Sequence, residues 1–264
     1  MHRRRALLAL ALAAGVASCT AVREHFPGPD APFVPTPEEV SLQMLQVAGV
    51  VPDDIVFDLG SGDGRVVIAA ARDFGARGVG VEIDPQLVSL SRDAALAAGV
   101  ASRVAFLWQD LFKVDLTAAT VVTLYLSEDV NLRLRPKLVR ELPPGTRVVS
   151  HDFDMGDWEP DRVQPVRSRS REHRLYLWLV PAAVAGAWQS RIGAEAVPLV
   201  LTQHFQKLAG TLGDQPATGR LSGARIELRA GSLTLRGVVS GDVIEGEAAA
   251  ADGPIQRWTA RRTG

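Results

Sequence analysis

A glycine-rich loop bordered by acidic residues is the part of this sequence best suited to chemistry. It follows a short apolar run, precedes a helical pattern, and reads Asp58-Leu59-Gly60-Ser61-Gly62-Asp63-Gly64-Arg65. Glycines permit a positive φ and let the backbone approach a ligand closely. The N–H groups at the start of the following helix can bind a carboxylate. The loop therefore predicts a binding site for a small polar ligand, although a glycine-rich loop alone is a weak signal.

The glycine spacing and the nearby acids narrow the chemistry of that ligand. The pattern is G-x-G-x-G, whereas loops that bind dinucleotides read G-x-G-x-x-G, so a dehydrogenase is disfavoured. Asp58, directly before the loop, would repel a pyrophosphate but suits a ligand that carries an ammonium and a sulfonium group. Glu82 ends the next apolar run, where a carboxylate can accept hydrogen bonds from both hydroxyls of a ribose.

Alternating strand and helix patterns must position these residues. Buried strands are predicted at 55–59, 78–83, 103–108, 120–126 and 147–152, helices at 36–48, 63–74, 84–98 and 127–141, and a closing hairpin at 163–166 and 173–180. Alternation at this spacing indicates a parallel α/β sheet. The first helix is expected to have Thr36 as its cap, Pro37 at its first position, and Glu39 completing a capping box.

This order of motifs resembles the class I S-adenosylmethionine (SAM) dependent methyltransferases. The blocks DLGSGDGR, GVEIDP, RVAFLWQDLF and RVVSHDFDMGDW, within about residues 33–158, are similar to bacterial and mitochondrial protein-lysine methyltransferases that act on the ATP synthase c subunit and the adenine nucleotide translocase. The resemblance implies a Rossmann-like, seven-stranded sheet over residues 33–180 and SAM as cofactor. It also implies methyl transfer to an acceptor, most favourably a lysine amine of a protein substrate.

The resemblance also assigns expected roles to individual residues. Asp58, Gly60 and Gly62 would surround the methionine part of SAM, Glu82 would hold the ribose, and Asp110 would read the adenine. The expected cofactor-binding set is completed by Thr36, Ser61 and Gly64.

Tyr125 and His151 are the candidate catalytic residues. Tyr125 lies at the end of the fourth predicted strand, a position that faces the transferred methyl group in this superfamily, but it is equally compatible with a core aromatic. His151 ends the fifth strand, where it can act as a base or as a hydrogen-bonded structural residue. The segment at Tyr125 lacks the Asp/Asn-Pro-Pro-aromatic motif of methyltransferases acting on nucleobases, so no nucleic acid is expected as a partner. Three basic residues, Arg133, Arg135 and Lys137, predict a solvated helix face.

The last third of the chain has a different pattern. Residues 181–264 contain short runs that alternate with a period close to two and are separated by glycines, which predicts a small antiparallel β module, a sandwich or a partial barrel. Trp188 and Trp258 are expected in its core. No catalytic cluster is visible there, and a role in recognising a substrate or a membrane protein is possible.

The first residues predict a targeting signal rather than a folded segment. Residues 1–19 combine arginines, a short apolar stretch and Val16-Ala17-Ser18-Cys19, which resembles a lipoprotein signal with acylation of Cys19. Residues 20–32 predict a Pro-rich tether. Because Cys19 is the only cysteine, an intramolecular disulfide and a Cys-based zinc site are excluded, and no metal ligands are expected. The net charge of -1 gives no strongly basic nucleic-acid footprint.

These expectations conflict over location. The signal indicates a membrane-anchored lipoprotein of the bacterial envelope, whereas SAM is made in the cytosol. Three resolutions stay open: the signal interpretation is wrong, the protein is cytoplasmic or held at the cytosolic face of the inner membrane, or the scaffold has lost methyl transfer and serves as an envelope binding module.

Overall fold

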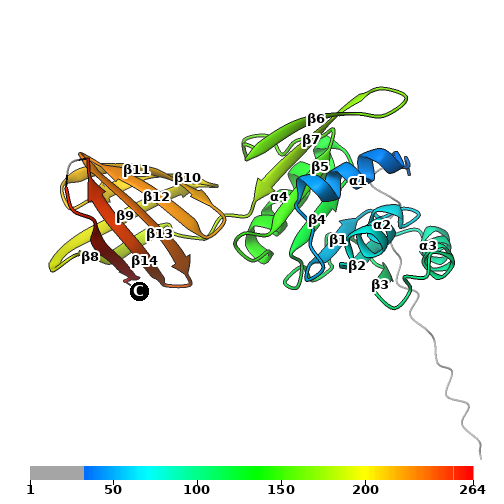
Figure 1. Cartoon of the computed structure of the whole chain (residues 1–264), viewed down its shortest axis with the longest axis horizontal. Coiled ribbons are helices and arrows are strands. Elements are labelled where there is room, and N and C mark those ends of the chain that lie inside the picture. Colours follow the sequence, from blue (N-terminus) through cyan, green and yellow to red (C-terminus); the bar gives the residue numbers. More distant parts are fainter. Residues whose placement is uncertain (1–32, 252, 264) are drawn as a thin grey trace, which may run out of the picture.

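The computed structural model describes residues 33–251 and 253–263, and within them two bodies of different architecture lie side by side (Figure 1). We refer to them as the α/β region, which runs from α1 to β7, and the barrel, which runs from β8 to β15. The predicted signal, Cys19 and the tether at 20–32 lie outside the described residues. Within the described ranges, no helix combines the length and the apolar character needed to cross a membrane.

The α/β region is built on a seven-stranded sheet of order β3-β2-β1-β4-β5-β7-β6. The five parallel strands are β1 Ile55–Leu59, β2 Arg77–Glu82, β3 Val104–Trp108, β4 Val121–Leu124 and β5 Arg147–His151. The hairpin of β6 Arg162–Arg167 and β7 Glu172–Leu179 adds antiparallel to β5. The predicted Rossmann-like sheet and its closing hairpin are confirmed. All five parallel strands end at one edge, where α/β sheets bind ligands.

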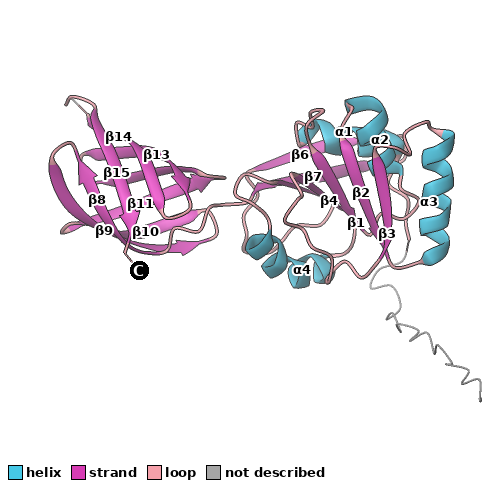
Figure 2. Cartoon of the chain, turned by 90° about the horizontal axis from the view of Figure 1, so that it is seen from below, coloured by secondary structure: helices cyan, strands magenta, loops and turns pink. Residues whose placement is uncertain are grey.

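Helices cover both faces of this sheet (Figure 2). They are α1 Glu38–Val47, α2 Arg65–Phe74, α3 Pro85–Ala97 and α4 Glu128–Glu141. Alternate residues of a strand face opposite sides of a sheet. Accordingly, Val56 packs with residues of α1 and α2, whereas its neighbour Phe57 packs with Leu134 and Leu138 of α4.

Two predicted helix starts need correction. Pro37, not Thr36, occupies the cap position of α1 and accepts the N–H groups of Val40 and Ser41 through its carbonyl; no side chain caps this helix. Glu39 accepts a hydrogen bond from the backbone of Arg169 (3.1 Å), so the predicted capping box is wrong. The helix predicted from residue 63 begins at 65, because Gly64 is held at a φ of 77° that helical residues do not adopt.

The C-terminal β module is a closed barrel of eight antiparallel strands. Its strands are β8 Gly186–Ile192, β9 Glu195–His204, β10 Lys207–Leu212, β11 Gln215–Ser222, β12 Arg225–Ala230, β13 Leu233–Ser240, β14 Val243–Ala250 and β15 Gln256–Arg262. The sequence analysis missed β8, which closes the barrel by pairing with β9 and β15. Trp188 and Trp258 are buried in the barrel core as expected, and their indole N–H groups donate to the Val184 carbonyl and the Ser190 hydroxyl.

Phe205 joins the barrel to the α/β region. Its ring stacks on Trp158 with a centroid separation of 5.6 Å, and the Arg135 guanidinium lies 5.3 Å from its ring centre. Arg135 also donates to the Met155 carbonyl (2.6 Å), and the neighbouring Lys137 is largely buried against Glu141 (2.5 Å). Arg133 is exposed, as expected for a solvated helix face. Arg135 and Lys137 are not, because Phe205, the segment after β5 and Glu141 cover them.

Replacing Phe205 by alanine is expected to lower the free energy of unfolding by about 3 kcal/mol, because a large aromatic contact between the two regions is lost. Urea denaturation of the variant measures the change. Val200→Ala is the matched control, since Val200 lies on the neighbouring strand β9 but is 46% exposed. An equal, small effect of both substitutions would show that Phe205 does not couple the regions.

Candidate active site

A pocket opens at the edge where the parallel strands end. Its lining includes Thr36, Asp58, Gly60, Ser61, Gly62, Glu82, Asp110 and Tyr125. These are all the residues predicted to bind the cofactor except Gly64, together with one of the two catalytic candidates. His151, the other candidate, does not line this pocket. The elements that bring the residues together are β1, β2, the loops after β3 and β4, and the segment before α1.

The glycine loop turns tightly under the pocket. Gly60 and Gly62 have φ values of 79° and 54°, which side chains rarely adopt. The N–H groups of Gly60 and Ser61 both donate to the Val81 carbonyl, which ties the loop to β2. A Cβ atom on Gly62 would lie 2.3 Å from the Phe33 ring. The missing side chains therefore leave room for the wall formed by the segment before α1.

Gly64 supports the loop from beneath. Its φ is 77°, and a Cβ atom there would lie 2.6 Å from the Phe106 ring and 2.9 Å from the Cβ of Ser91. Gly64→Ala is expected to lower the free energy of unfolding by about 2–4 kcal/mol, because backbone strain and overpacking add. Gly99→Ala is the control, since Gly99 also has a positive φ (70°) but no neighbouring atom within 4 Å. Chemical denaturation of both variants separates the two causes, and equal losses would rule out a packing role for Gly64.

Glu82 is held rigidly at the end of β2. Its Oε2 accepts the Gly62 N–H (2.9 Å), and its Oε1 accepts the N–H groups of Ile83 (2.8 Å) and Asp84 (3.0 Å). The side chain is buried but lines the pocket. Three backbone donors thus fix a carboxylate in place before any ligand arrives, and its one remaining lone pair, on Oε2, can accept a hydroxyl group.

Asp58 is a buried acid whose pKa is raised. Thr123 donates a hydrogen bond to its Oδ1 (2.7 Å), and no ion pair to Asp58 exists among the described residues. Burial raises the pKa of this carboxyl from its ordinary value of 3.8 to about 7, and the negative charges of Glu82 and Asp63 add to the effect. A cationic ligand would supply the missing counter-charge.

Two further groups complete the pocket. Asp110, after β3, is largely buried and accepts the Phe112 N–H (2.9 Å) through Oδ1. The Thr36 carbonyl accepts a hydrogen bond from Arg65 (2.7 Å), which also pairs with Asp63 of the glycine loop. The segment before α1 is thereby tied to the loop and closes one side of the pocket.

Tyr125 links the pocket to a polar cluster behind it. It follows β4 directly, and its ring stacks on the ring of His151 at a centroid distance of 3.9 Å and an interplanar angle of 28°. His151 is fully buried, and desolvation lowers its pKa to about 4. A histidine that is neutral at ordinary pH and lies outside the pocket is badly placed to take a proton from an ammonium group. This geometry favours His151 as a support for Tyr125.

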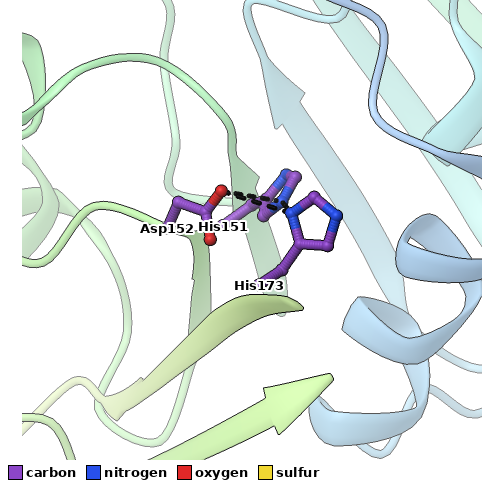
Figure 3. A group of neighbouring side chains, drawn as sticks. All are labelled: His151, Asp152 and His173. Carbon is purple, nitrogen blue, oxygen red and sulfur yellow. Dashed lines mark hydrogen bonds and ion pairs between the residues drawn. The ribbon is translucent and has the colours of Figure 1, made fainter. Parts of the chain in front are cut away.

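The polar cluster contains two residues that the sequence analysis did not select, Asp152 and His173 (Figure 3). Nε2 of His151 lies 2.8 Å from Nδ1 of His173, and both atoms lie 3.3 Å from Oδ2 of Asp152. Arg171 pairs with the same Asp152 oxygen (2.5 Å). The sequence did contain a signal for His173. It lies two residues before the apolar Leu175 along β7, so both side chains face the same, buried side of the sheet.

Comparisons with known proteins point to the α/β region. A family profile described as the ANTKMT methyltransferase domain matches residues 58–162. The protein-lysine N-methyltransferase of Saccharolobus islandicus (strain REY15A) is 45% identical over 153 residues, which are 58% of this chain and 95% of that protein. The adenine nucleotide translocase lysine N-methyltransferase of Mus musculus is 43% identical over 40% of this chain and 46% of its own length, so the chain spans about half of that relative.

One solved structure adds a second description. The crystal structure of an RNA methyltransferase from Salinibacter ruber in complex with S-adenosyl-L-homocysteine is 54% identical to this chain, with a TM-score of 0.54, over 57% of this chain and 96% of that one. Its bound product of SAM agrees with the cofactor expected from the glycine loop.

Proposed function

Because this chain belongs to the family of SAM-dependent methyltransferases that includes the protein-lysine N-methyltransferase of Saccharolobus islandicus, we propose that it methylates the side-chain amine of a protein lysine. One observation carries the proposal: two acids line the same pocket, which extends to Tyr125. Asp58 is buried without an ion-pair partner among the described residues, and Glu82 is fixed by backbone hydrogen bonds. These two carboxylate acceptors suit a ligand that carries a cationic group and a ribose.

The residues present fit SAM. Asp58 would face the ammonium group, Glu82 would accept a ribose hydroxyl, and Asp110 would contact the adenine, and all three line the pocket. Ser61 lines the pocket, but its hydroxyl oxygen is buried and has no hydrogen-bond partner within the described ranges. SAM, when bound, supplies an electrophilic methyl group on a positively charged sulfur.

Tyr125 is the residue we assign to positioning the acceptor amine. The amine must arrive without its proton and in line with the methyl carbon, so that a C–N bond forms as the C–S bond breaks. The proton that the amine loses leaves to solvent. Tyr125 is fixed by its stacking on His151 and lies near Phe153, with ring centroids 6.4 Å apart. Aromatic faces of this kind stabilise a nearby cation, which favours the charged reacting groups.

RNA methylation is the second candidate function. The observation in its favour is the 54% identity to the Salinibacter ruber structure described as an RNA methyltransferase. Against it stand the net charge of -1 and the sequence Leu124-Tyr125-Leu126-Ser127, which lacks the motif that nucleobase amino-methyltransferases carry at this position.

Labelling with radioactive SAM distinguishes the two candidates. The purified full chain is incubated with labelled SAM and a bacterial lysate, and the label is followed after separate digestion with protease and ribonuclease. We expect protein-bound label that yields methylated lysine after hydrolysis and that is absent with Glu82→Ala. Ribonuclease-sensitive label would instead support RNA methylation. No label from a sample that binds SAM would contradict both.

The location of the protein is part of the same proposal. We propose that the apolar stretch within residues 1–19 holds the chain at the inner membrane without cleavage before Cys19, so that the α/β region meets SAM at the cytosolic face. Membrane fractionation and labelling with a fatty acid test this anchor, and an acyl label that Cys19→Ala removes would show an exported lipoprotein instead. Protease treatment of intact cells then reports which face the protein occupies, and digestion from outside would contradict the cytosolic assignment.

A further inference from the structure

Three potential metal ligands converge behind Tyr125. They are Nε2 of His151, Oδ2 of Asp152 and Nδ1 of His173, with separations of 2.8, 3.3 and 3.3 Å (Figure 3). Ligand atoms that share a tetrahedral metal with bonds of about 2.1 Å lie roughly 3.3 Å apart. Only the two nitrogen atoms must separate further, by a few tenths of an ångström, to hold such an ion.

The surrounding groups orient these atoms toward one another. Nε2 of His173 lies 2.9 Å from the Ser168 hydroxyl, which also accepts the N–H groups of Ser170 and Arg171. With Nε2 donating to Ser168, Nδ1 of His173 keeps a free lone pair for a metal. Hydrogen bonding of the outer nitrogen in this way is usual for metal-binding histidines.

The backbone of Asp152 is held in an uncommon conformation. Its φ is 64°, which is uncommon for residues other than glycine. Its N–H donates to the Arg174 carbonyl (2.7 Å), and its Oδ1 accepts the Arg174 N–H (2.9 Å). These two bonds to β7 leave Oδ2 directed at both imidazoles.

We propose that His151, Asp152 and His173 form a binding site for a divalent transition-metal ion of the zinc class. Two imidazoles and one carboxylate are a donor set that such ions prefer, and a water molecule can complete the coordination. The bound ion fixes the ring of His151 and, through their stacking, the ring of Tyr125. Metal binding can be measured without methyl transfer, so the site can be tested whether or not the lysine assignment holds.

Arg171 makes the site tunable. Its guanidinium pairs with Oδ2 of Asp152, and it is about half exposed, so it can move away when an ion binds. Its positive charge opposes a second cation at the same oxygen. Removing the charge of Arg171 is therefore expected to strengthen metal binding. If Arg171 only held Asp152 in place, its removal would weaken metal binding instead.

Titration of the purified, chelator-treated full chain with Co²⁺ tests the site directly. We expect one Co²⁺ per chain with a visible absorption band, displaced by Zn²⁺. His173→Gln is expected to weaken binding about 100-fold and Ser168→Ala about 10-fold, whereas Arg171→Ala strengthens it. The matched control is His204→Ala, which removes an exposed histidine that also pairs with an aspartate, Asp157, at 3.1 Å.

A measurement on the wild-type chain tests the metal site even if a variant does not fold. X-ray absorption of the zinc-loaded wild-type chain is expected to show nitrogen and oxygen ligands with imidazole scattering. Sulfur in the shell would assign the ion to Cys19 and overturn the proposal. So would a folded wild-type chain that binds no Co²⁺, or binding that His173→Gln leaves unchanged.

Discussion

Lowering the pH from about 8 to about 6 is expected to weaken SAM binding roughly tenfold, because the ligand requires the ionised form of Asp58. In the ligand-free protein, burial raises the pKa of this carboxyl to about 7. Most molecules are therefore ionised at the higher pH and protonated at the lower one. Below the pKa, binding of the cationic ligand must expel a proton, and that cost grows with each further fall in pH.

Calorimetry in buffers of different ionisation enthalpy measures both the affinity and the protons released. Thr123→Val serves as the diagnostic variant, because the Thr123 hydroxyl donates to Asp58 and lowers the pKa of its carboxyl. Without this hydrogen bond, the midpoint of the pH dependence should move to higher pH. If the pH dependence came from ionisable groups of SAM itself, the midpoint would be the same in the wild type and in Thr123→Val. That outcome would exclude Asp58 as the cause.

The raised pKa of Asp58 also predicts that the ligand-free protein becomes less stable as the pH rises, although its SAM binding becomes stronger. The unfolded chain loses the Asp58 proton near pH 3.8, whereas the folded protein keeps it up to a pKa of about 7. The folded state binds more protons across this window, so the free energy of unfolding falls as the pH rises through it, by up to about 4 kcal/mol. Asp58→Asn should remove that slope and stabilise the ligand-free protein above pH 7, while its SAM binding is lost. An unchanged slope in denaturation experiments would contradict a buried, protonated Asp58.

Local sequence patterns were sufficient to predict the pocket. The loop from Asp58 to Gly64 and the acid at Glu82 are encoded by consecutive strand, turn and helix signals, and parallel strands bring their ends to one edge without further information. Tyr125 was located by the same logic, since β4 ends directly before it. Placing Asp58, Glu82 and Tyr125 at one pocket therefore required the order of the strands but no side-chain contact, whereas Thr36, Ser61 and Asp110 were expected from the family resemblance.

Features that depend on distant partners were not predictable in this way. The cluster of His151 and His173 forms because β7 pairs antiparallel with β5, and this register is not written in either strand alone. The burial of Arg135 depends on Phe205 of the barrel, which lies far along the chain. The missed strand β8 buries Trp188, Ser190 and Ile192 on one side, and the polar Ser190 at the centre of that side interrupts the apolar alternation.

Glu82→Ala is expected to reduce SAM affinity by about 100-fold, because a charged acceptor for a ribose hydroxyl, worth roughly 3 kcal/mol, is lost. The substitution also leaves three backbone N–H groups, those of Gly62, Ile83 and Asp84, without their acceptor. Glu82→Gln keeps a carbonyl acceptor but loses the charge, so an intermediate loss of about 10-fold is expected.

A 2′-deoxy analogue of S-adenosylhomocysteine separates ribose binding from support of the loop. The wild-type protein should bind this analogue more weakly than S-adenosylhomocysteine itself, whereas Glu82→Gln should discriminate between the two much less. If the variant discriminates as strongly as the wild type, Glu82 acts only on the glycine loop through the Gly62 N–H. The geometry argues for both effects, because its Oε2 accepts a loop N–H while the same carboxylate lines the pocket.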